Sequence, residues 1–264
     1  MRAGFETIAV ERRGEHVLVL TLDRPEASNA MNTQMGRDLI AVLEALALDT
    51  EGLRCLVVTG RGGKAFCAGG DLKERKGMTD DAWIAQHLVY ERMVRALTGC
   101  PVPAIAAVNG AAYGGGCEIA LGCDFLYAAP HARFALTEVT LGIMPGAGGT
   151  QTLPRAVGER RAKEIILTGA PFSAEEGQSW GMVNRLVEAG RLLDETLATA
   201  ERIAANAPIA VRQAKQSIHR GMRMALSDGL AFEIEAYNRM VSTEDRREGV
   251  LAFNEKRRPH FKGR

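Results

Sequence analysis

Short apolar runs rich in β-branched residues alternate with longer segments of helical periodicity over the first two thirds of the chain. The apolar runs predict buried strands at 16–22, 54–60, 103–110, 124–130 and 132–136. Asn32 can cap a helix with apolar residues at helical spacing, a second helix is predicted at 80–97, and a third follows the glycines at 114–116. Strands that alternate with helices of this length predict an α/β fold with parallel strands.

The pattern changes in the last third of the chain. From Gly190 onward there is no strand candidate, and amphipathic patterns predict helices at 192–205 and 208–219. We therefore expect a spiral α/β core over residues 1–205 and an α-helical C-terminal appendage over residues 206–264.

Composition and charge exclude several classes of protein. The 264 residues include 33 Lys and Arg against 32 Asp and Glu, and this balance argues against a nucleic-acid-binding protein. Apolar runs are too short to span a membrane and the N-terminal segment lacks the apolar centre of a secretory signal, so we expect a cytoplasmic protein without a membrane partner. The five cysteines and five histidines show no metal-ligand spacing, so no metal site is expected.

Two glycine-rich stretches invite a nucleotide-binding interpretation, and both fail on detail. The stretch 60–64 lacks the spacing of a phosphate-binding loop, and 110–116 lacks the glycine pattern of the dinucleotide fingerprint. Glycines ahead of a helix can instead leave backbone N–H groups free at the positive end of the helix dipole. Together with the small residues at 65–74, they can direct two N–H groups at one carbonyl oxygen, where an oxyanion develops during acyl chemistry.

Five segments make a specific resemblance possible. The motifs "DRPEASNAMN", "AFCAGGDLKE", "NGAAYGGGCEIALGCDF", "FALTEVTLGIMPGAGGTQTLPR" and "FNEKRRPHFKGR" occur in order from Arg24 to the C-terminus. Together they resemble the crotonase (enoyl-CoA hydratase/isomerase) superfamily. The resemblance implies a spiral of ββα units with a helical appendage that forms a trimer or a dimer of trimers. It also implies an acyl-CoA substrate and no separate cofactor, because coenzyme A enters as part of the substrate.

The resemblance also implies the site residues. The oxyanion hole falls on the backbone amides of Ala68 and Gly115, and the catalytic pair on Glu118 and Glu138. The acyl-CoA contacts fall on Arg24, Ala27, Ala65, Ala68, Gly69, Gly70, Asp71, Leu72 and Gly115, and on Phe253 and Lys256 from a neighbouring subunit. We interpret Asp71 as a residue that holds its loop by hydrogen bonds.

This residue set predicts an enoyl-CoA hydratase, a hydro-lyase of fatty-acid β-oxidation that reversibly adds water to 2-enoyl-CoA. We expect Glu118 to take a proton from water and Glu138 to protonate Cα, with environments that separate their pKa values. The alternatives are a methylglutaconyl-CoA hydratase, which "FCAGGDLKERKGM" resembles, and another acyl-CoA isomerase, dehydratase or hydrolase. A further alternative is a non-catalytic scaffold or RNA-binding member of the fold. The acyl group stays open.

Overall fold

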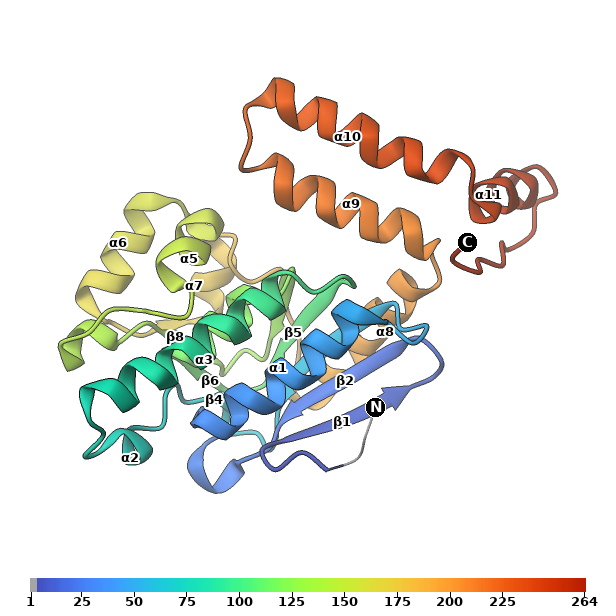
Figure 1. Cartoon of the computed structure of the whole chain (residues 1–264). Coiled ribbons are helices and arrows are strands. Elements are labelled where there is room, and N and C mark those ends of the chain that lie inside the picture. The colour runs from blue at the N-terminus through green and yellow to red at the C-terminus, as the bar shows by residue number, and fades with distance from the viewer. Residues whose placement is uncertain (1–3) are drawn as a thin grey trace.

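The computed structural model describes residues 4–264 and is built around a six-stranded sheet (Figure 1). The strand order in this sheet is β1-β2-β3-β5-β7-β10, and only β1 runs antiparallel to its neighbour. The strands are β1 (Ile8–Arg13), β2 (Val17–Leu22), β3 (Cys55–Gly60), β5 (Ala104–Val108), β7 (Phe125–Ala128) and β10 (Arg185–Leu186). The predicted α/β class with parallel strands is confirmed.

A second, four-stranded sheet is made by short strands that alternate along the chain with those of the first. It has the order β4-β6-β8-β9, formed by β4 (Ala65–Cys67), β6 (Ala111–Tyr113), β8 (Arg133–Ala135) and β9 (Phe172–Ser173). Each of the pairs β3–β4, β5–β6 and β7–β8 places one strand in each sheet and then leads into helices. These helices are α2 (Leu72–Arg75) with α3 (Asp80–Thr98), α4 (Gly115–Gly122), and η2 (Glu138–Leu141) with α5 (Gly149–Val157). This repetition is the predicted spiral of ββα units.

Helices cover both faces of the large sheet. Successive residues of β3 point to opposite faces, so Val57 packs against α8 (Leu192–Ala204) while Leu56 and Val58 face the cluster that includes α1 (Thr33–Leu48), α3 and α4. All six residues of β3 are buried, as expected for a central parallel strand. The predicted cap of α1 is confirmed, because the Asn32 side chain accepts a hydrogen bond from the Met35 amide at 2.9 Å.

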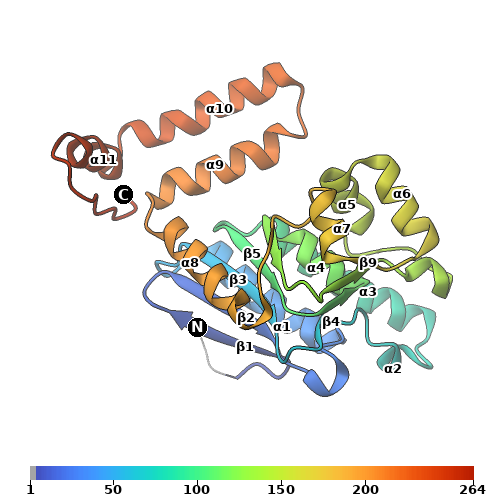
Figure 2. The ribbon, with the colours of Figure 1, turned by 180° about the vertical axis from the view of Figure 1, so that it is seen from behind.

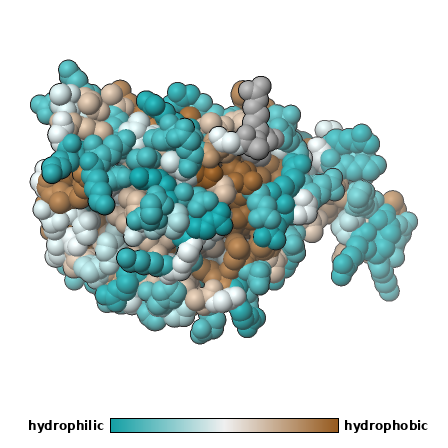
Figure 3. Space-filling model, turned by 90° about the horizontal axis from the view of Figure 1, so that it is seen from below, coloured by the Kyte–Doolittle hydropathy of each residue, from teal (hydrophilic) through white to brown (hydrophobic). Residues whose placement is uncertain are grey.

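The chain leaves this core after α8. Helices α9 (Pro208–Gly221) and α10 (Leu226–Val241) form a hairpin, and α11 (Glu244–Asn254) lies at the end of this hairpin where α9 begins (Figures 1 and 2). The absence of strands after Gly190 is confirmed for the described chain. Seen from below, the surface is mainly hydrophilic, with an apolar area near the middle of the view (Figure 3).

Several elements were not predicted from the sequence. Strands β4 and β6 have three residues each and lie inside the glycine-rich stretches, so they lack the apolar run that marks a longer strand. The remaining unpredicted elements are β1, β9, β10, η1 (Pro25–Ala27), α2, η2, α5, α6 (Glu159–Thr168), α7 (Ala174–Ser179) and η3 (Ala189–Arg191). No helix within residues 4–264 is long and apolar enough to cross a bilayer.

Candidate active site

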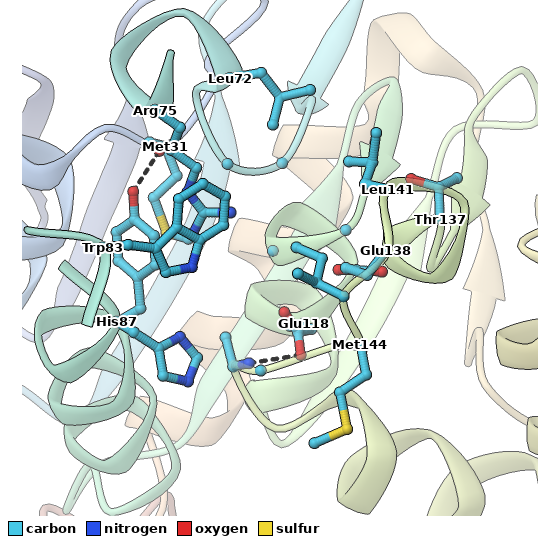
Figure 4. Close-up of a pocket in the computed structure, with 18 of the residues that line it drawn as sticks. Met31, Leu72, Arg75, Trp83, His87, Glu118, Thr137, Glu138, Leu141 and Met144 are labelled. Atoms are coloured by element: carbon cyan, nitrogen blue, oxygen red, sulfur yellow. Dashed lines mark hydrogen bonds between the residues drawn. The ribbon is translucent and has the colours of Figure 1, made fainter. Parts of the chain in front are cut away.

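The glycine-rich turns and both predicted glutamates line a single pocket (Figure 4). One wall is formed by α2, α3 and the loop after β4, and the other by the start of α4, η2 and the loop that precedes α5. The structure therefore brings Glu138 of η2 to the start of α4, which carries both Gly115 and Glu118. The surface that lines the pocket is mostly apolar, and this lowers the local dielectric around any charge that forms in it.

The amide of Gly115 is free because it belongs to the first residue of α4. Gly114 precedes it with a φ of 48°, a conformation that glycine adopts without strain. Within residues 4–264 the Gly115 N–H has no acceptor, as expected for the first turn of a helix. A Cβ atom on Gly116 would lie 2.1 Å from the carbonyl oxygen of Cys67, so only glycine lets α4 pack this closely against β4.

The second predicted amide, that of Ala68, is already occupied. Its N–H donates to the carbonyl oxygen of Ser28 at 3.1 Å, which corrects the expectation that Ala68 supplies an oxyanion donor. Two residues later, the N–H of Gly70 has no acceptor in the described part of the chain. A Cβ atom built on Gly115 would lie 4.0 Å from the nitrogen of Gly70, so these two free donors are neighbours. Gly70 and Gly115 are therefore the pair that fits a single oxyanion.

Glu118 lies in the first turn of α4 and is 3% exposed. Its Oε1 accepts hydrogen bonds from the amides of Ala147 and Gly149, both at 2.8 Å, and Figure 4 draws a hydrogen bond to this carboxyl. The pKa of Glu118 is raised to about 7, chiefly by burial and also by the nearby Glu138, while the two amides and the Arg75 cation lower it. A carboxyl with a pKa close to neutrality can both accept and release a proton.

Glu138 begins η2 and lies beside Glu118 on the same side of the pocket (Figure 4). A Cβ atom on Gly114 would lie 3.0 Å from Glu138 Oε1, which places this carboxyl beside the start of α4. Its Oε2 is buried and has no hydrogen-bond partner among residues 4–264. Burial also raises the pKa of Glu138, so its protonated form is favoured by the pocket. Both glutamates therefore direct carboxyl oxygens into the pocket.

The predicted acyl-CoA contacts divide into two groups. Ala68, Gly69, Gly70, Leu72 and Gly115 line the pocket. Arg24 and Asp71 instead form an ion pair at 2.9 Å, and Asp71 also caps α2 by accepting the amides of Lys73 and Glu74. This bonding agrees with the interpretation that Asp71 holds its loop.

Two further predicted contacts lie outside the pocket lining. Ala65 is buried in β4, and its carbonyl accepts the Asn29 side chain at 2.9 Å, so Ala65 has no surface to offer a ligand. Ala27 ends η1 beside the Arg24 loop.

The two C-terminal contacts lie far from this pocket within one chain. Phe253 is on α11, with its side chain 83% exposed, and Lys256 follows that helix. Helix α11 lies at the opposite end of the molecule from α2 and α3 (Figure 1). A single chain therefore does not bring Phe253 or Lys256 to the glutamate pair.

Some residues of the site were not predicted from the sequence as functional. Ala147 and Gly149 were not among the predicted site residues, yet their amides hold Glu118. The glycines ahead of α5 are a signal of free N–H donors. Arg75, which lies within the quoted segment "FCAGGDLKERKGM", also lines the pocket with Trp83 and His87, and none of the three was among the predicted site residues. No group of metal-ligating side chains occurs in the part of the chain that the structure describes.

Comparisons with known proteins agree with this geometry. The family model for enoyl-CoA hydratase/isomerase matches residues 12–264. The short-chain-enoyl-CoA hydratase of Clostridium acetobutylicum is 42% identical over 254 residues, which cover 96% of this chain and 97% of that protein. The 2,3-dehydroadipyl-CoA hydratase of Escherichia coli is 42% identical over 252 residues, 96% of this chain and 97% of that protein.

The fold comparison gives the same result. The crystal structure of enoyl-CoA hydratase from Bacillus anthracis has a TM-score of 0.96 and 42% identity, and the match covers 98% of this chain and 100% of that one. The predicted crotonase-type spiral is therefore confirmed. With a family model matched over nearly its full length and relatives above 40% identity, the chain belongs to the enoyl-CoA hydratase/isomerase family.

Proposed function

We propose that this protein is an enoyl-CoA hydratase that reversibly converts 2-enoyl-CoA thioesters to 3-hydroxyacyl-CoA. The supporting observation is that two buried carboxyls and two free amides face the same pocket. Hydration needs a base, an acid and a site for enolate charge, and these four groups supply all three. The hydratase names of the relatives support the same reaction.

The proposed reaction uses the side chains and amides of this chain. The carboxylate of Glu118 takes a proton from water while the water oxygen bonds to Cβ. The electron pair of the Cα=Cβ bond moves toward the thioester, and the oxygen charge is held by the amides of Gly70 and Gly115. Glu138 then delivers its proton to Cα, which gives the 3-hydroxyacyl thioester. The Glu118 proton returns to Glu138 through solvent before the next turnover.

The division of roles follows from the hydrogen bonds of the two carboxyls. Two amide donors at 2.8 Å stabilise the carboxylate of Glu118 against the larger effect of burial, and with a pKa of about 7 this group is partly charged at neutral pH and can act as the base. Glu138 Oε2 has no donor in the described structure, so a charge there is uncompensated and the protonated acid is favoured. The reaction needs no additional cofactor, and we propose that none is used.

Crotonyl-CoA tests this function directly. We expect the absorbance of the conjugated thioester to fall on adding the purified protein, and the product to gain the mass of one water. An isomerase would move the double bond without that gain in mass, and a non-catalytic member would leave the absorbance unchanged. Either result would overturn the proposed hydratase function.

We also propose that the chain works as a trimer or a dimer of trimers. Five apolar residues of α10, each at least 47% exposed, repeat at helical spacing along one side of that helix: Leu226, Leu230, Ile234, Tyr237 and Val241. An exposed apolar stripe of this length is typical of a protein–protein contact. Assembly also offers a route for Phe253 and Lys256 to reach a neighbouring pocket.

Light scattering of the full chain tests the assembly. We expect the mass of three or six chains, and dissociation when Leu230 and Ile234 are both replaced by glutamate. The variant Arg239→Glu changes an exposed position on another side of α10 and should leave the mass unaltered. A monomeric wild-type protein would contradict the proposal.

We also propose a cytoplasmic location. All five cysteines are buried free thiols, which supports a reducing compartment such as the cytoplasm. A place in fatty-acid β-oxidation stays a prediction.

A further inference from the structure

A cation occupies the wall of the pocket opposite the two glutamates. Arg75, the last residue of α2, lines this pocket together with Trp83 and His87, and Figure 4 shows the three on the same side. An arginine side chain is charged at any working pH. The hydration reaction proposed above assigns it no role, and a pocket for a purely apolar acyl chain has no use for a fixed positive charge.

The guanidinium is held in place by contacts that leave part of it free. Its Nε donates to Gln86 Oε1 at 2.8 Å, and Gln86 is 3% exposed. The amide nitrogen of Gln86 donates to Thr33 Oγ1 at 2.8 Å and to Glu74 Oε2 at 2.7 Å, which fixes its oxygen toward Arg75. This network positions the cation before any ligand arrives.

Aromatic rings hold the other side of the cation. The Arg75 Cζ lies 4.3 Å from the centre of the Trp83 ring and 5.6 Å from that of Tyr90. Stacking of this kind suits a planar guanidinium and keeps its edge available for hydrogen bonds.

The terminal nitrogens of Arg75 lack an anionic partner. Within residues 4–264, no Asp or Glu oxygen lies within ion-pair distance of Arg75, and its Nη groups have no hydrogen-bond acceptor. A Cβ atom on Gly70 would lie 3.4 Å from both Cζ and Nη1 of Arg75. The unpaired edge is therefore close to the amide that we assign to the thioester oxygen, and a group a few bonds beyond that thioester can reach it.

We propose that Arg75 binds a second carboxylate carried by the acyl group, so that the preferred substrates are short 2-enoyl thioesters of dicarboxylic acids. A carboxylate matches the two free edges of a guanidinium with a pair of parallel hydrogen bonds. This proposal rests on the proposed function, because it names the substrate class of the same site. The alternative use of Arg75, as a charge that acts only on Glu118 and Glu138, is an outcome of the test below.

Two saturated thioesters of equal shape isolate the effect of the carboxylate. Glutaryl-CoA ends in a carboxylate, and 5-methylhexanoyl-CoA places an isopropyl group at the same position; neither has a double bond to hydrate. Calorimetry gives Kd for each with the wild-type protein and the Arg75→Met variant. We expect the variant to reduce the preference for glutaryl-CoA over 5-methylhexanoyl-CoA by about 10–100-fold.

Three controls accompany this measurement. Arg95→Met removes the same charge from an exposed position on α3 and should keep the wild-type preference. Arg75→Lys keeps the charge without the planar fork and should lose less than Arg75→Met. Free CoA reports on contacts outside the acyl group.

If Arg75→Met changes the ratio of the two Kd values by less than about threefold, the proposal is overturned. An equal loss of affinity for both thioesters and for free CoA would also overturn it. Hydration rates of glutaconyl-CoA and 5-methylhex-2-enoyl-CoA complete the test. If glutaryl-CoA shows the expected preference and no enoyl thioester is hydrated, the hydratase function fails and the carboxylate site stands. If crotonyl-CoA is hydrated without any such preference, the carboxylate site alone fails.

Discussion

Replacing either Glu118 or Glu138 by glutamine should reduce kcat for crotonyl-CoA hydration by about 10²–10⁴-fold. Glutamine keeps the shape of the side chain but cannot exchange a proton at the reacting atoms. At position 118 its carbonyl oxygen can still accept the amides of Ala147 and Gly149. We therefore expect the affinity for a saturated acyl-CoA to persist. The Glu91→Gln change, at a partly exposed position of α3, is the matched control, and a near-wild-type rate in either pocket variant would refute the paired mechanism.

The Glu118→Gln variant should also change how stability depends on pH. Because burial raises the pKa of Glu118 from 4.5 to about 7, the folded chain binds this proton more tightly than the unfolded chain. The contribution of Glu118 to stability is therefore largest below pH 4.5 and falls as the pH rises to about 7. The variant lacks this titration. We therefore expect its Tm minus the Tm of the wild type to be larger at pH 8 than at pH 5. An equal Tm difference at both values would contradict the raised pKa.

Removing the Gly115 N–H should reduce kcat by about 10²–10³-fold, the usual cost of losing one oxyanion donor. Gly115→Pro achieves this at the first position of α4, where proline suits the helix backbone and no helical hydrogen bond is lost. The measurement is single-turnover hydration of crotonyl-CoA, with binding of a saturated thioester followed separately.

Gly115→Ala is the control for this change. It adds a Cβ atom while keeping the N–H, and that atom would meet the flexible end of Met31 at 2.8 Å. We expect the alanine variant to lose far less activity than the proline variant. Equal losses would show that the space beside Met31, rather than the amide, limits the reaction, and would remove Gly115 from the proposed oxyanion hole.

The long elements of the fold could be predicted because the spacing of their apolar residues shows which side of each element is buried. The apolar residues of α1 and the continuous apolar run of β3 each specify their own structure. Strands β4 and β6 could not be found this way, because three residues carry no period and their pairing depends on partners that are distant in the sequence. The predicted boundary at residues 205 and 206 falls between α8 and α9, although whether the appendage trimerises stays a prediction.

For the site, the sequence was informative about residue types and less so about which atoms are free. The glycines ahead of a helix indicated free N–H donors, whereas the choice of Gly115 and Glu118 themselves came from the family resemblance. The choice of Ala68 was wrong because the acceptor of its amide, the Ser28 carbonyl, lies forty residues earlier, and no pattern near Ala68 shows it. Arg75 resembles an ordinary charged helix end, and its orientation depends on Gln86 and Trp83 of another helix.

The two amides that converge on Glu118 limit what else this pocket can become. A hydrophobic residue at position 118 would leave the N–H groups of Ala147 and Gly149 in a buried wall without an acceptor, at roughly 1–3 kcal/mol each. A Cβ atom on Gly149 would also lie 3.0 Å from Glu118 Oε1, so the turn before α5 packs closely against this oxygen atom. Any new chemistry engineered at this position has to bring its own acceptor or rebuild that turn.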